Sequence, residues 1–297
     1  MGFEYLTNVP LAQARKEYLE RLVSGGFGSK TETIPVFESC GRVTAKAVYA
    51  HICAPHYAAS AMDGVAVSAK ETFGATETTP VTLKPDQFLV LDTGDPIPED
   101  KDAVIMVEDI VKNGDGSITI HAAAAPWQHI RQIGEDVCAG EMILPSHMTV
   151  SPAAIGAMIA GGVLEIEVIR KPVVGIIPTG DEIIPPCTDP KPGDILEFNG
   201  SIFSAMVRSW GAEAVVYPIV PDKFNQIKEM VAKAADECDM VILNAGSSAG
   251  REDFSARVIR ELGEVLYHGI AIKPGKPAIL GCRGEKVILG VPGYPVS

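Results

Sequence analysis

The sequence has few of the features that mark secreted, metal-binding or membrane-spanning proteins. Its six cysteines are spread over 297 residues, without the close pairs of a zinc site or the spacing of a disulfide framework. The six histidines form no motif with ligand spacing, so a histidine-based metal site is not expected. No apolar run reaches membrane-spanning length, and the N-terminus has amphipathic helix spacing, unlike a signal peptide. These absences favour a reduced cytoplasmic protein.

Positive charge is also scarce. The chain carries 25 Lys and Arg residues against 38 Asp and Glu residues, a formal net charge of -13. This balance disfavours nucleic acid or an anionic membrane as the main partner. If the ligand is itself an anion, local cations must offset the field of the protein. The length is sufficient for two or three domains with sizeable cores.

From Val173 onward, short apolar runs alternate with helix-like stretches, which is typical of βαβ units. This alternation predicts an α/β fold, with a largely parallel sheet covered by helices on both faces. The expected strands are residues 173–177, 214–220, 240–243, 265–272 and 286–291. The expected helices are residues 201–210, a helix capped by Asp222, and residues 254–262.

The upstream half has a different pattern. Short β-like runs separated by Gly, Pro and Asp predict a β-rich inserted domain over residues 46–141. A helix is expected over residues 151–163, with Ser151 as its N-cap, packed with the N-terminal segment. We therefore predict a helical and extended linker domain formed by residues 1–45 with 142–171, and an α/β domain over residues 172–297.

Four loops that follow the expected strands of the α/β domain are rich in Gly, Pro, hydroxyl groups and charge. They are "PTGDEI" (178–183), "NAGSSAGRED" (244–253), "KPGKP" (273–277) and "PGYP" (292–295). Ligands of such sheets bind outside the carboxyl ends of the strands. We expect the four loops to converge on one edge of the sheet.

The loop 244–253 presents Gly and Ser backbone N–H groups just before a helix, which suits a phosphate or a carboxylate. An ordinary strand-to-helix turn, capped by Ser and Asp, is the alternative. The loop matches neither the P-loop nor the GxGxxG fingerprint, so nucleoside triphosphate or NAD binding is not supported.

Charged side chains in the other loops suit an anionic ligand with a metal ion. Asp181 and Glu182 suit coordination of Mg²⁺ or a ligand hydroxyl, although a solvated turn with the same residues is an open alternative. Lys273 and Lys276 stand on a stiff Pro-Gly frame and suit a phosphate or an oxyanion; solvated surface lysines are the alternative.

The β-rich region is unusually acidic around "SAMDGVAV" (60–67), "LDTGDPIPEDKDAVIMVED" (91–109) and "RQIGED" (131–136). Such a charge run is commonly a solvated face, but the turn at Thr93-Gly94 indicates a shaped loop. An anionic ligand beside so many carboxylates needs a cation, and Mg²⁺ is the simplest companion.

Taken in order, six of these stretches resemble the MoeA family of molybdopterin molybdenumtransferases, to which the E domain of gephyrin belongs. They are "SAMDGVAV", "TGDPIPEDKDAVIMVE", "RQIGEDVCAGE", "PTGDEI", "KPGKP" and "VPGYPVS". The resemblance implies a three-layer α/β molybdopterin-binding domain, an inserted β-rich domain, and an elongated homodimer whose site is shared between subunits. It also implies insertion of molybdate into adenylyl-molybdopterin with release of AMP, with Mg²⁺ required.

The resemblance further implies roles for individual residues. Catalytic roles fall on Asp63, Asp136, Glu182 and Asp253, and metal binding falls on Asp181, Glu182 and Glu135. Binding of the molybdopterin substrate falls on Thr93, Thr179, Gly180, Asn244, Gly246, Ser247, Ser248, Gly250, Lys273, Lys276, Pro292 and Pro295. A molybdopterin adenylyltransferase is a further expected partner.

The chain departs from the family pattern at Ala245 and Ser247 of the Gly/Ser loop and at Tyr294 of the last motif. It also ends at "GYPVS", where the family continues into a helix and a C-terminal β domain, so we expect a fragment or a truncated form. Two alternatives stay open: a molybdopterin adenylyltransferase, and a non-catalytic molybdopterin-binding sensor or scaffold.

Overall fold

A computed structural model describes residues 8–245, 254–273 and 275–293. The chain divides into two compact units. The first joins residues up to Lys30 with Arg170–Ser297, and the second is Thr31–Ile169. Each unit is described by itself. In the described ranges, no helix combines the length and the apolar character needed to cross a bilayer.

The first unit is built on a six-stranded sheet with the strand order β16-β13-β17-β20-β19-β18. Its strands are β13 (Val173–Pro178), β16 (Glu213–Val216), β17 (Met240–Ala245), β18 (Glu264–His268), β19 (Ile279–Arg283) and β20 (Lys286–Pro292). Strands β16, β13, β17 and β20 are parallel to one another, and β19 is antiparallel to both of its neighbours. The predicted α/β class with a largely parallel sheet is confirmed.

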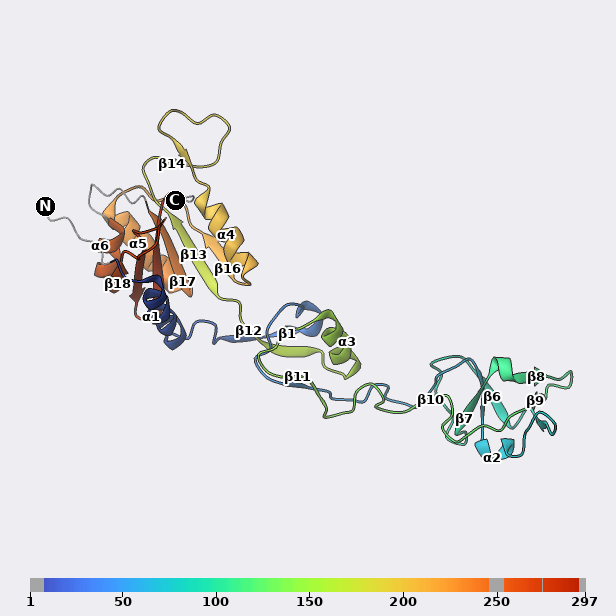
Figure 1. The fold of residues 1–297 in the computed structure, drawn as a ribbon. Coiled ribbons are helices and arrows are strands. Elements are labelled where there is room, and N and C mark those ends of the chain that lie inside the picture. Colours follow the sequence, from blue (N-terminus) through green and yellow to red (C-terminus); the bar gives the residue numbers. More distant parts are fainter. Residues whose placement is uncertain (1–7, 246–253, 274, 294–297) are drawn as a thin grey trace. The chain divides into compact units, whose positions relative to one another are not determined.

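Helices cover both faces of this sheet, because successive strand residues point to opposite sides. Val241 and Leu243 face the core shared with α5 (Phe224–Glu237) and α6 (Phe254–Leu262). Ile242 faces the opposite core, which it shares with Val207 of α4 (Asn199–Ser209). The result is the expected three-layer arrangement, with the sheet in the middle (Figure 1).

The N-terminal helix α1 (Leu11–Ser24) packs on this sheet, so the unit differs from the predicted domain boundaries. The sequence prediction grouped residues 1–45 with 142–171. In the structure, Ala14 and Tyr18 are buried against Leu280 and Val287 of the sheet. The amphipathic spacing of α1 shows which face of the helix is buried, but not which part of the protein covers that face. The sequence therefore placed α1 in the wrong domain.

Three predictions about single elements were wrong in detail. The strand β19 was not predicted. It forms an antiparallel hairpin with β20, and a search for alternating strands and helices does not detect such a hairpin. The strand expected over residues 214–220 ends at Val216. Helix α5 begins at Phe224, with Lys223 in the N-cap position and no side-chain cap, so Asp222 is not its cap.

The second unit contains two hydrophobic cores. One joins the short 3₁₀ helix Val36–Glu38 and the strand β12 (Glu165–Ile169), which pairs with β1 (Thr31–Pro35), to the helix α3 (Pro152–Ala160). Ser151 caps α3 by accepting a hydrogen bond from the Ala154 N–H at 3.2 Å, as predicted. Part of the N-terminal segment, at Ile34 and Val36, therefore packs with α3, as expected, whereas α1 belongs to the first unit.

The other core of this unit is β-rich, as predicted for this part of the chain. It lies between two three-stranded sheets, β6-β4-β7 and β5-β9-β8. The strands are β4 (Gly64–Val67), β5 (Val81–Leu83), β6 (Phe88–Leu91), β7 (Ala103–Met106), β8 (Ile110–Lys112) and β9 (Ile118–Ile120). It also holds the α-helix α2 (Ala69–Thr72), which spans four residues, and a short 3₁₀ helix, Val107–Asp109.

The smaller two-stranded pairs are β2 (Val48–Tyr49) with β11 (Met142–Leu144), and β3 (Ala59–Ser60) with β10 (Ile130–Arg131). In the first unit, β14 (Ile183–Ile184) pairs with β15 (Ile195–Leu196). The pair β2–β11 adds Val48, Ile143 and Leu144 to the core around α3.

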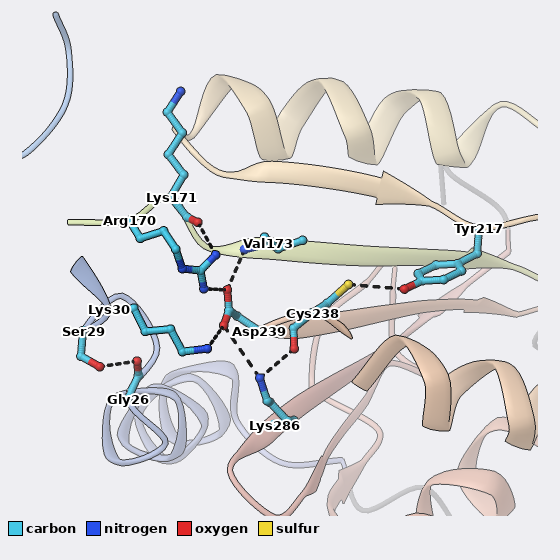
Figure 2. Close-up of polar contacts among 10 residues, drawn as sticks. All are labelled: Gly26, Ser29, Lys30, Arg170, Lys171, Val173, Tyr217, Cys238, Asp239 and Lys286. Atoms are coloured by element: carbon cyan, nitrogen blue, oxygen red, sulfur yellow. Dashed lines mark hydrogen bonds and ion pairs between the residues drawn. The ribbon is translucent and has the colours of Figure 1, made fainter. Parts of the chain in front are cut away.

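Positively charged side chains surround the carboxylate of Asp239, which stands just before β17 (Figure 2). Its carboxylate accepts hydrogen bonds from Lys30 Nζ at 3.0 Å and from the Val173 N–H at 2.9 Å, and it also pairs with Arg170. Burial alone raises the pKa of Asp239, but these donors outweigh it and lower the pKa to about 2. Lys30 and Arg170 are the residues at which the chain leaves and re-enters this unit.

We expect Asp239→Asn to lower the free energy of unfolding by about 1–2 kcal/mol at pH 7, after allowing for solvent screening around Lys30. The depressed pKa means that the stabilisation is present above about pH 4, the unfolded value, and is lost as the pH falls towards 2. Urea unfolding of both proteins at pH 7 and at pH 3 measures this. The control is Asp236→Asn, which breaks an exposed pair with Arg283 and should change stability by less than about 0.5 kcal/mol. Equal stability of the Asp239 variant and the parent at pH 7 would contradict the account.

Candidate functional site

The register of the sheet aligns the carboxyl ends of its parallel strands. Pro178 of β13 lies opposite Asn244 of β17, and Ala245 lies opposite Pro292 of β20. The connection from β18 to β19 leaves at the same edge, because Ile279 lies opposite Gly290 of β20. The prediction that the four loops start from one edge of the sheet is therefore confirmed.

Three buried polar side chains at this edge carry an atom without a hydrogen-bond partner among the described residues. They are Thr179 (Oγ1), Asn199 (Oδ1) and Asn244 (Oδ1), which are 3%, 5% and 5% exposed. The Thr179 N–H donates to the Asn244 carbonyl at 2.8 Å, so these two residues are adjacent. An unsatisfied buried polar group costs about 1–3 kcal/mol. Their presence together at the carboxyl edge indicates a place prepared for a polar ligand.

Asn199 was not among the predicted site residues. It begins α4, and its Nδ2 donates to the Gly293 carbonyl at 2.8 Å, which ties the helix start to the end of β20. The next residue is Gly200, at which an added Cβ would stand 2.8 Å from Glu197 and 3.0 Å from Val216. The sequence prediction began this helix two residues too late and left "NG" in a loop. The Asn-Gly pair between an acid and an apolar helix was the available signal.

Carboxylates gather at the end of β13. Asp181 and Glu182 are exposed, and Asp181 Oδ1 accepts a hydrogen bond from the Asp222 N–H at 3.1 Å. Burial and then repulsion from Glu182 and Asp181 raise the pKa of the Asp222 carboxyl. Asp222 thus belongs with the two predicted carboxylates. The sequence offered only its position after a strand end as a signal.

An open groove of about 600 Å³ lies beside these acids. Pro178, Gly180, Asp181, Glu197 and Tyr217 contribute to its lining. Gly180 has φ +147°, and a Cβ at this position would stand 2.6 Å from Ile183. The tight turn that presents Asp181 to the groove, with Glu182 beside it in the chain, therefore requires a glycine.

Within the described ranges, no cluster of three His, Cys, Asp or Glu side chains is placed to hold a metal ion. The two neighbouring carboxylates at the end of β13 fit Mg²⁺ nonetheless, since that ion usually takes one or two carboxylates together with substrate phosphates and water. Asp181 and Glu182 supply such a pair, and their repulsion is the second cause, after burial, of the raised pKa of Asp222.

Lys273 and Lys276 lie in the connection between β18 and β19, at the same edge, and both are exposed. The turn between them is shaped by two backbone hydrogen bonds, from the Ile270 N–H to the Lys276 carbonyl and from the Ala278 N–H to the Gly275 carbonyl. Pro292 ends β20 at this edge as well. The predicted residues Gly246, Ser247, Ser248, Gly250, Asp253 and Pro295, and the divergent Tyr294, lie outside the described residues.

The second unit brings two predicted residues together. Asp63 precedes β4 and Thr93 follows β6, and the antiparallel pairing of these strands makes them neighbours. Asp63 Oδ1 accepts hydrogen bonds from the Thr93 N–H at 2.6 Å and from Thr93 Oγ1 at 2.7 Å. These two bonds, the side-chain bond foremost, lower the pKa of Asp63. The adjacent Gly64 is required because an added Cβ would stand 2.0 Å from the Ile105 carbonyl oxygen.

Asp136 and Glu135, also predicted, are both paired with Arg131. Arg131 Nη2 donates to the two carboxylate oxygens of Asp136 at 2.9 and 3.0 Å, and its Nε lies 3.6 Å from Glu135. Glu135 also accepts a hydrogen bond from the Gln132 N–H at 3.1 Å. Both carboxylates are held in one exposed turn by these contacts.

Thr179→Val tests whether the unsatisfied hydroxyl serves a ligand. Because valine has the same shape and no polar atom, we expect the free energy of unfolding of the free protein to rise by about 1 kcal/mol. The affinity for the ligand should fall by about tenfold, the effect of one lost hydrogen bond. Urea unfolding and equilibrium binding measure the two effects. A destabilised variant with unchanged affinity would show that the hydroxyl is satisfied within the protein.

Comparisons with known proteins agree over most of the chain. Residues 9–162 match the family model described as the MoeA N-terminal region (domain I and II), and residues 175–297 match the probable molybdopterin binding domain. The molybdopterin molybdenumtransferase of Haemophilus influenzae is 32% identical over 97% of this chain and 73% of its own length. The molybdopterin molybdenumtransferase 2 of Mycobacterium tuberculosis is 33% identical over 89% of this chain and 71% of its own length.

A solved structure extends this similarity to the fold. The molybdopterin biosynthesis MoeA protein from Pyrococcus horikoshii aligns with a TM-score of 0.82 and 32% sequence identity. The alignment covers 98% of this chain and 76% of that protein. The similarity therefore includes both compact units.

Proposed function

This chain belongs to the MoeA family, and we propose that it acts in molybdenum cofactor biosynthesis as a molybdopterin molybdenumtransferase. The reaction inserts molybdate into adenylyl-molybdopterin and releases AMP. The observation that carries the site assignment is the set of unsatisfied buried polar atoms of Thr179, Asn199 and Asn244 at the carboxyl edge of the sheet.

The chemistry of these atoms suits a pterin. The amide oxygens of Asn199 and Asn244 accept hydrogen bonds, and a pterin ring system presents several N–H donors. An acceptor that is buried without a partner gains most from such a donor, because binding removes its desolvation cost. We assign these two oxygens to the heterocycle, and not to a phosphate, which itself offers only acceptors when ionised.

Charged residues at the same edge of the sheet would bind the anionic part of the substrate. Lys273 and Lys276 supply exposed ammonium groups that offset the net negative charge of the chain. Asp181 and Glu182 would hold Mg²⁺, which neutralises charge on the pyrophosphate that links the pterin to AMP. Predicted residues of the Gly/Ser loop, Gly246, Ser247, Ser248 and Gly250, would bind phosphate through their backbone N–H groups.

The acids of the second unit complete the proposal. Asp63 keeps one carboxylate oxygen on Thr93, which leaves its other oxygen available to a substrate, a water or a metal ion. Asp136 and Glu135 are positioned by Arg131. We propose that they act in a homodimer with a site shared between subunits, in the cytoplasm. Sedimentation velocity checks the dimer, and a purely monomeric protein would exclude a shared site.

The decisive experiment follows AMP. The purified chain is incubated with adenylyl-molybdopterin, Mg²⁺ and molybdate, and AMP is quantified over time. A molybdenumtransferase releases AMP only when molybdate is present, and it does so more slowly when Mg²⁺ is chelated. AMP release that ignores molybdate contradicts the proposal.

Two other functions have their own outcomes in this experiment. Formation of adenylyl-molybdopterin from ATP and molybdopterin would identify an adenylyltransferase. Tight binding of molybdopterin without either product would identify a sensor or scaffold. Neither is favoured by the comparisons. The curated relatives from Haemophilus influenzae and Mycobacterium tuberculosis are named molybdopterin molybdenumtransferases, and this chain matches most of their length.

A further inference from the structure

Two cysteines lie opposite each other in the second unit. Ala54 and Val137 form an antiparallel bridge, in which the Ala54 N–H donates to the Val137 carbonyl at 2.8 Å and the Val137 N–H donates back at 3.1 Å. Cys53 and Cys138 are the next residues along these two segments. They occupy the position beside a hydrogen-bonded pair, where Cα atoms of antiparallel segments come within about 4.5 Å and side chains are closest.

The two sulfur atoms occupy the same small space. A Cβ atom built on Gly134 would stand 2.9 Å from Cys138 Sγ and 3.5 Å from Cys53 Sγ. Cys138 Sγ donates to the Gly134 carbonyl at 3.4 Å, and Cys53 Sγ accepts from the Ala139 N–H at 3.4 Å. Both thiols therefore point towards the turn that begins at Gly134, and both are free.

We propose that Cys53 and Cys138 form a reversible disulfide, a redox-sensitive staple across the turn that carries Glu135 and Asp136. Disulfides require Cα atoms about 4.4–6.8 Å apart, and directly opposed residues of an antiparallel pair fall in or near that range. A glycine at position 134 leaves room for both sulfur atoms beside this turn.

The reaction needs an oxidant, for which a low-molecular-weight disulfide such as oxidised glutathione serves. The exposed Cys138, as its thiolate, attacks one sulfur of oxidised glutathione, and one glutathione thiolate leaves. The Cys53 thiolate then attacks the Cys138 sulfur of the mixed disulfide and releases the second glutathione thiolate. The two protons lost by the cysteines pass to the glutathione thiolates or to solvent. In a reducing compartment the equilibrium returns to two thiols.

The staple acts on the turn through contacts that already exist. The Gly134 N–H donates to the Pro55 carbonyl at 2.9 Å, and the Asp136 N–H donates to the Ala54 carbonyl at 3.0 Å. A disulfide between Cys53, next to Ala54, and Cys138, two residues after Asp136, opposes the breaking of these hydrogen bonds. We infer that oxidation slows the local opening that exposes the Asp136 amide.

The test uses the full chain, first reduced and then equilibrated with oxidised glutathione. Peptide mapping without reductant should recover Cys53 and Cys138 in one disulfide-linked pair, with two thiols per chain lost to alkylation. The Cys40→Ser/Cys187→Ser variant, which lacks two exposed thiols elsewhere, should form the same pair in the same yield. Absence of this pair at a large excess of oxidised glutathione would overturn the proposal, as would equal pairing with Cys40 or Cys187.

Hydrogen exchange provides the second readout. Exchange of the Asp136 amide should slow about tenfold in the oxidised chain and recover when dithiothreitol is added. Cys138→Ser should show the reduced rate under both conditions. If the disulfide forms but the Asp136 amide exchanges at the same rate in both states, the pair does not act on the turn and that part of the proposal is wrong.

Discussion

Asp63→Asn is expected to slow molybdate-dependent AMP release by about 100-fold or more, the usual scale for loss of a charged catalytic group. Asparagine keeps an oxygen that can accept from Thr93, so the connection between β4 and β6 should survive. What is lost is the negative charge. Because the hydrogen bonds from Thr93 lower the pKa of Asp63, the parent carboxylate is ionised at any neutral pH. Single-turnover release of AMP from bound adenylyl-molybdopterin measures the effect.

Two further variants make this result specific. Asp86→Asn removes an exposed carboxylate from the same β-rich region and should leave the rate unchanged. Thr93→Val removes one of the two donors to Asp63 but keeps the backbone N–H, so a smaller loss of about tenfold is expected. If Asp63→Asn and Asp86→Asn release AMP equally fast, Asp63 is not part of the catalytic machinery.

Gly180→Ala is the second change from which we expect a large effect. The backbone of Gly180 has φ +147°, and the new Cβ would stand 2.6 Å from Ile183 and 3.1 Å from the Glu182 carboxylate. The turn must shift to relieve this contact, and the shift displaces Asp181 and Glu182. A displacement of catalytic or metal-binding groups by about 1 Å commonly costs about 100-fold in rate. We expect that loss in AMP release, together with a free energy of unfolding lowered by about 1–3 kcal/mol.

Gly193→Ala is the matched control for backbone strain. Gly193 also has a positive φ, +100°, but an added Cβ there meets nothing within 4 Å. It lies in the connection between β14 and β15 and is not among the residues that line the groove. It should lose stability to a similar degree and keep its rate of AMP release. Equal rates for the two variants would show that the position of Asp181 and Glu182 does not limit the reaction.

The α/β unit was largely predictable because its strands are short apolar runs and its helices have a clear period. Residues 173–177 and 254–262 were predicted nearly to the residue. The antiparallel strand β19 was not, because "AILGCR" lacks a helix before it and the βαβ pattern gives no signal for an antiparallel strand between β18 and β20. The place of α1 was missed for a different reason. Its buried Tyr18 belongs to the same hydrophobic cluster as Leu280, and packing across that sequence distance leaves no local pattern.

The residues of the candidate site also fall into two groups, those that sequence motifs predict and those that depend on tertiary contacts. Motifs located Thr179, Gly180 and Asn244, because each stands at or just after the end of an apolar strand and the topology of parallel sheets brings strand ends together. Asn199 and Asp222 come from a helix start and from the end of a separate connection. Their membership depends on tertiary packing, on the Gly293 carbonyl and the Asp181 carboxylate respectively. Single-sequence patterns carry no information about such contacts.

The central claim is that the carboxyl edge of the six-stranded sheet binds molybdopterin through side chains left without partners in the protein. A crystal structure of the chain with bound adenylyl-molybdopterin tests it most directly. The account predicts pterin N–H groups within hydrogen-bonding distance of Asn244 Oδ1 and Asn199 Oδ1, and a polar substrate atom on Thr179 Oγ1. A pterin bound elsewhere, with these three atoms still unpaired, would contradict the account.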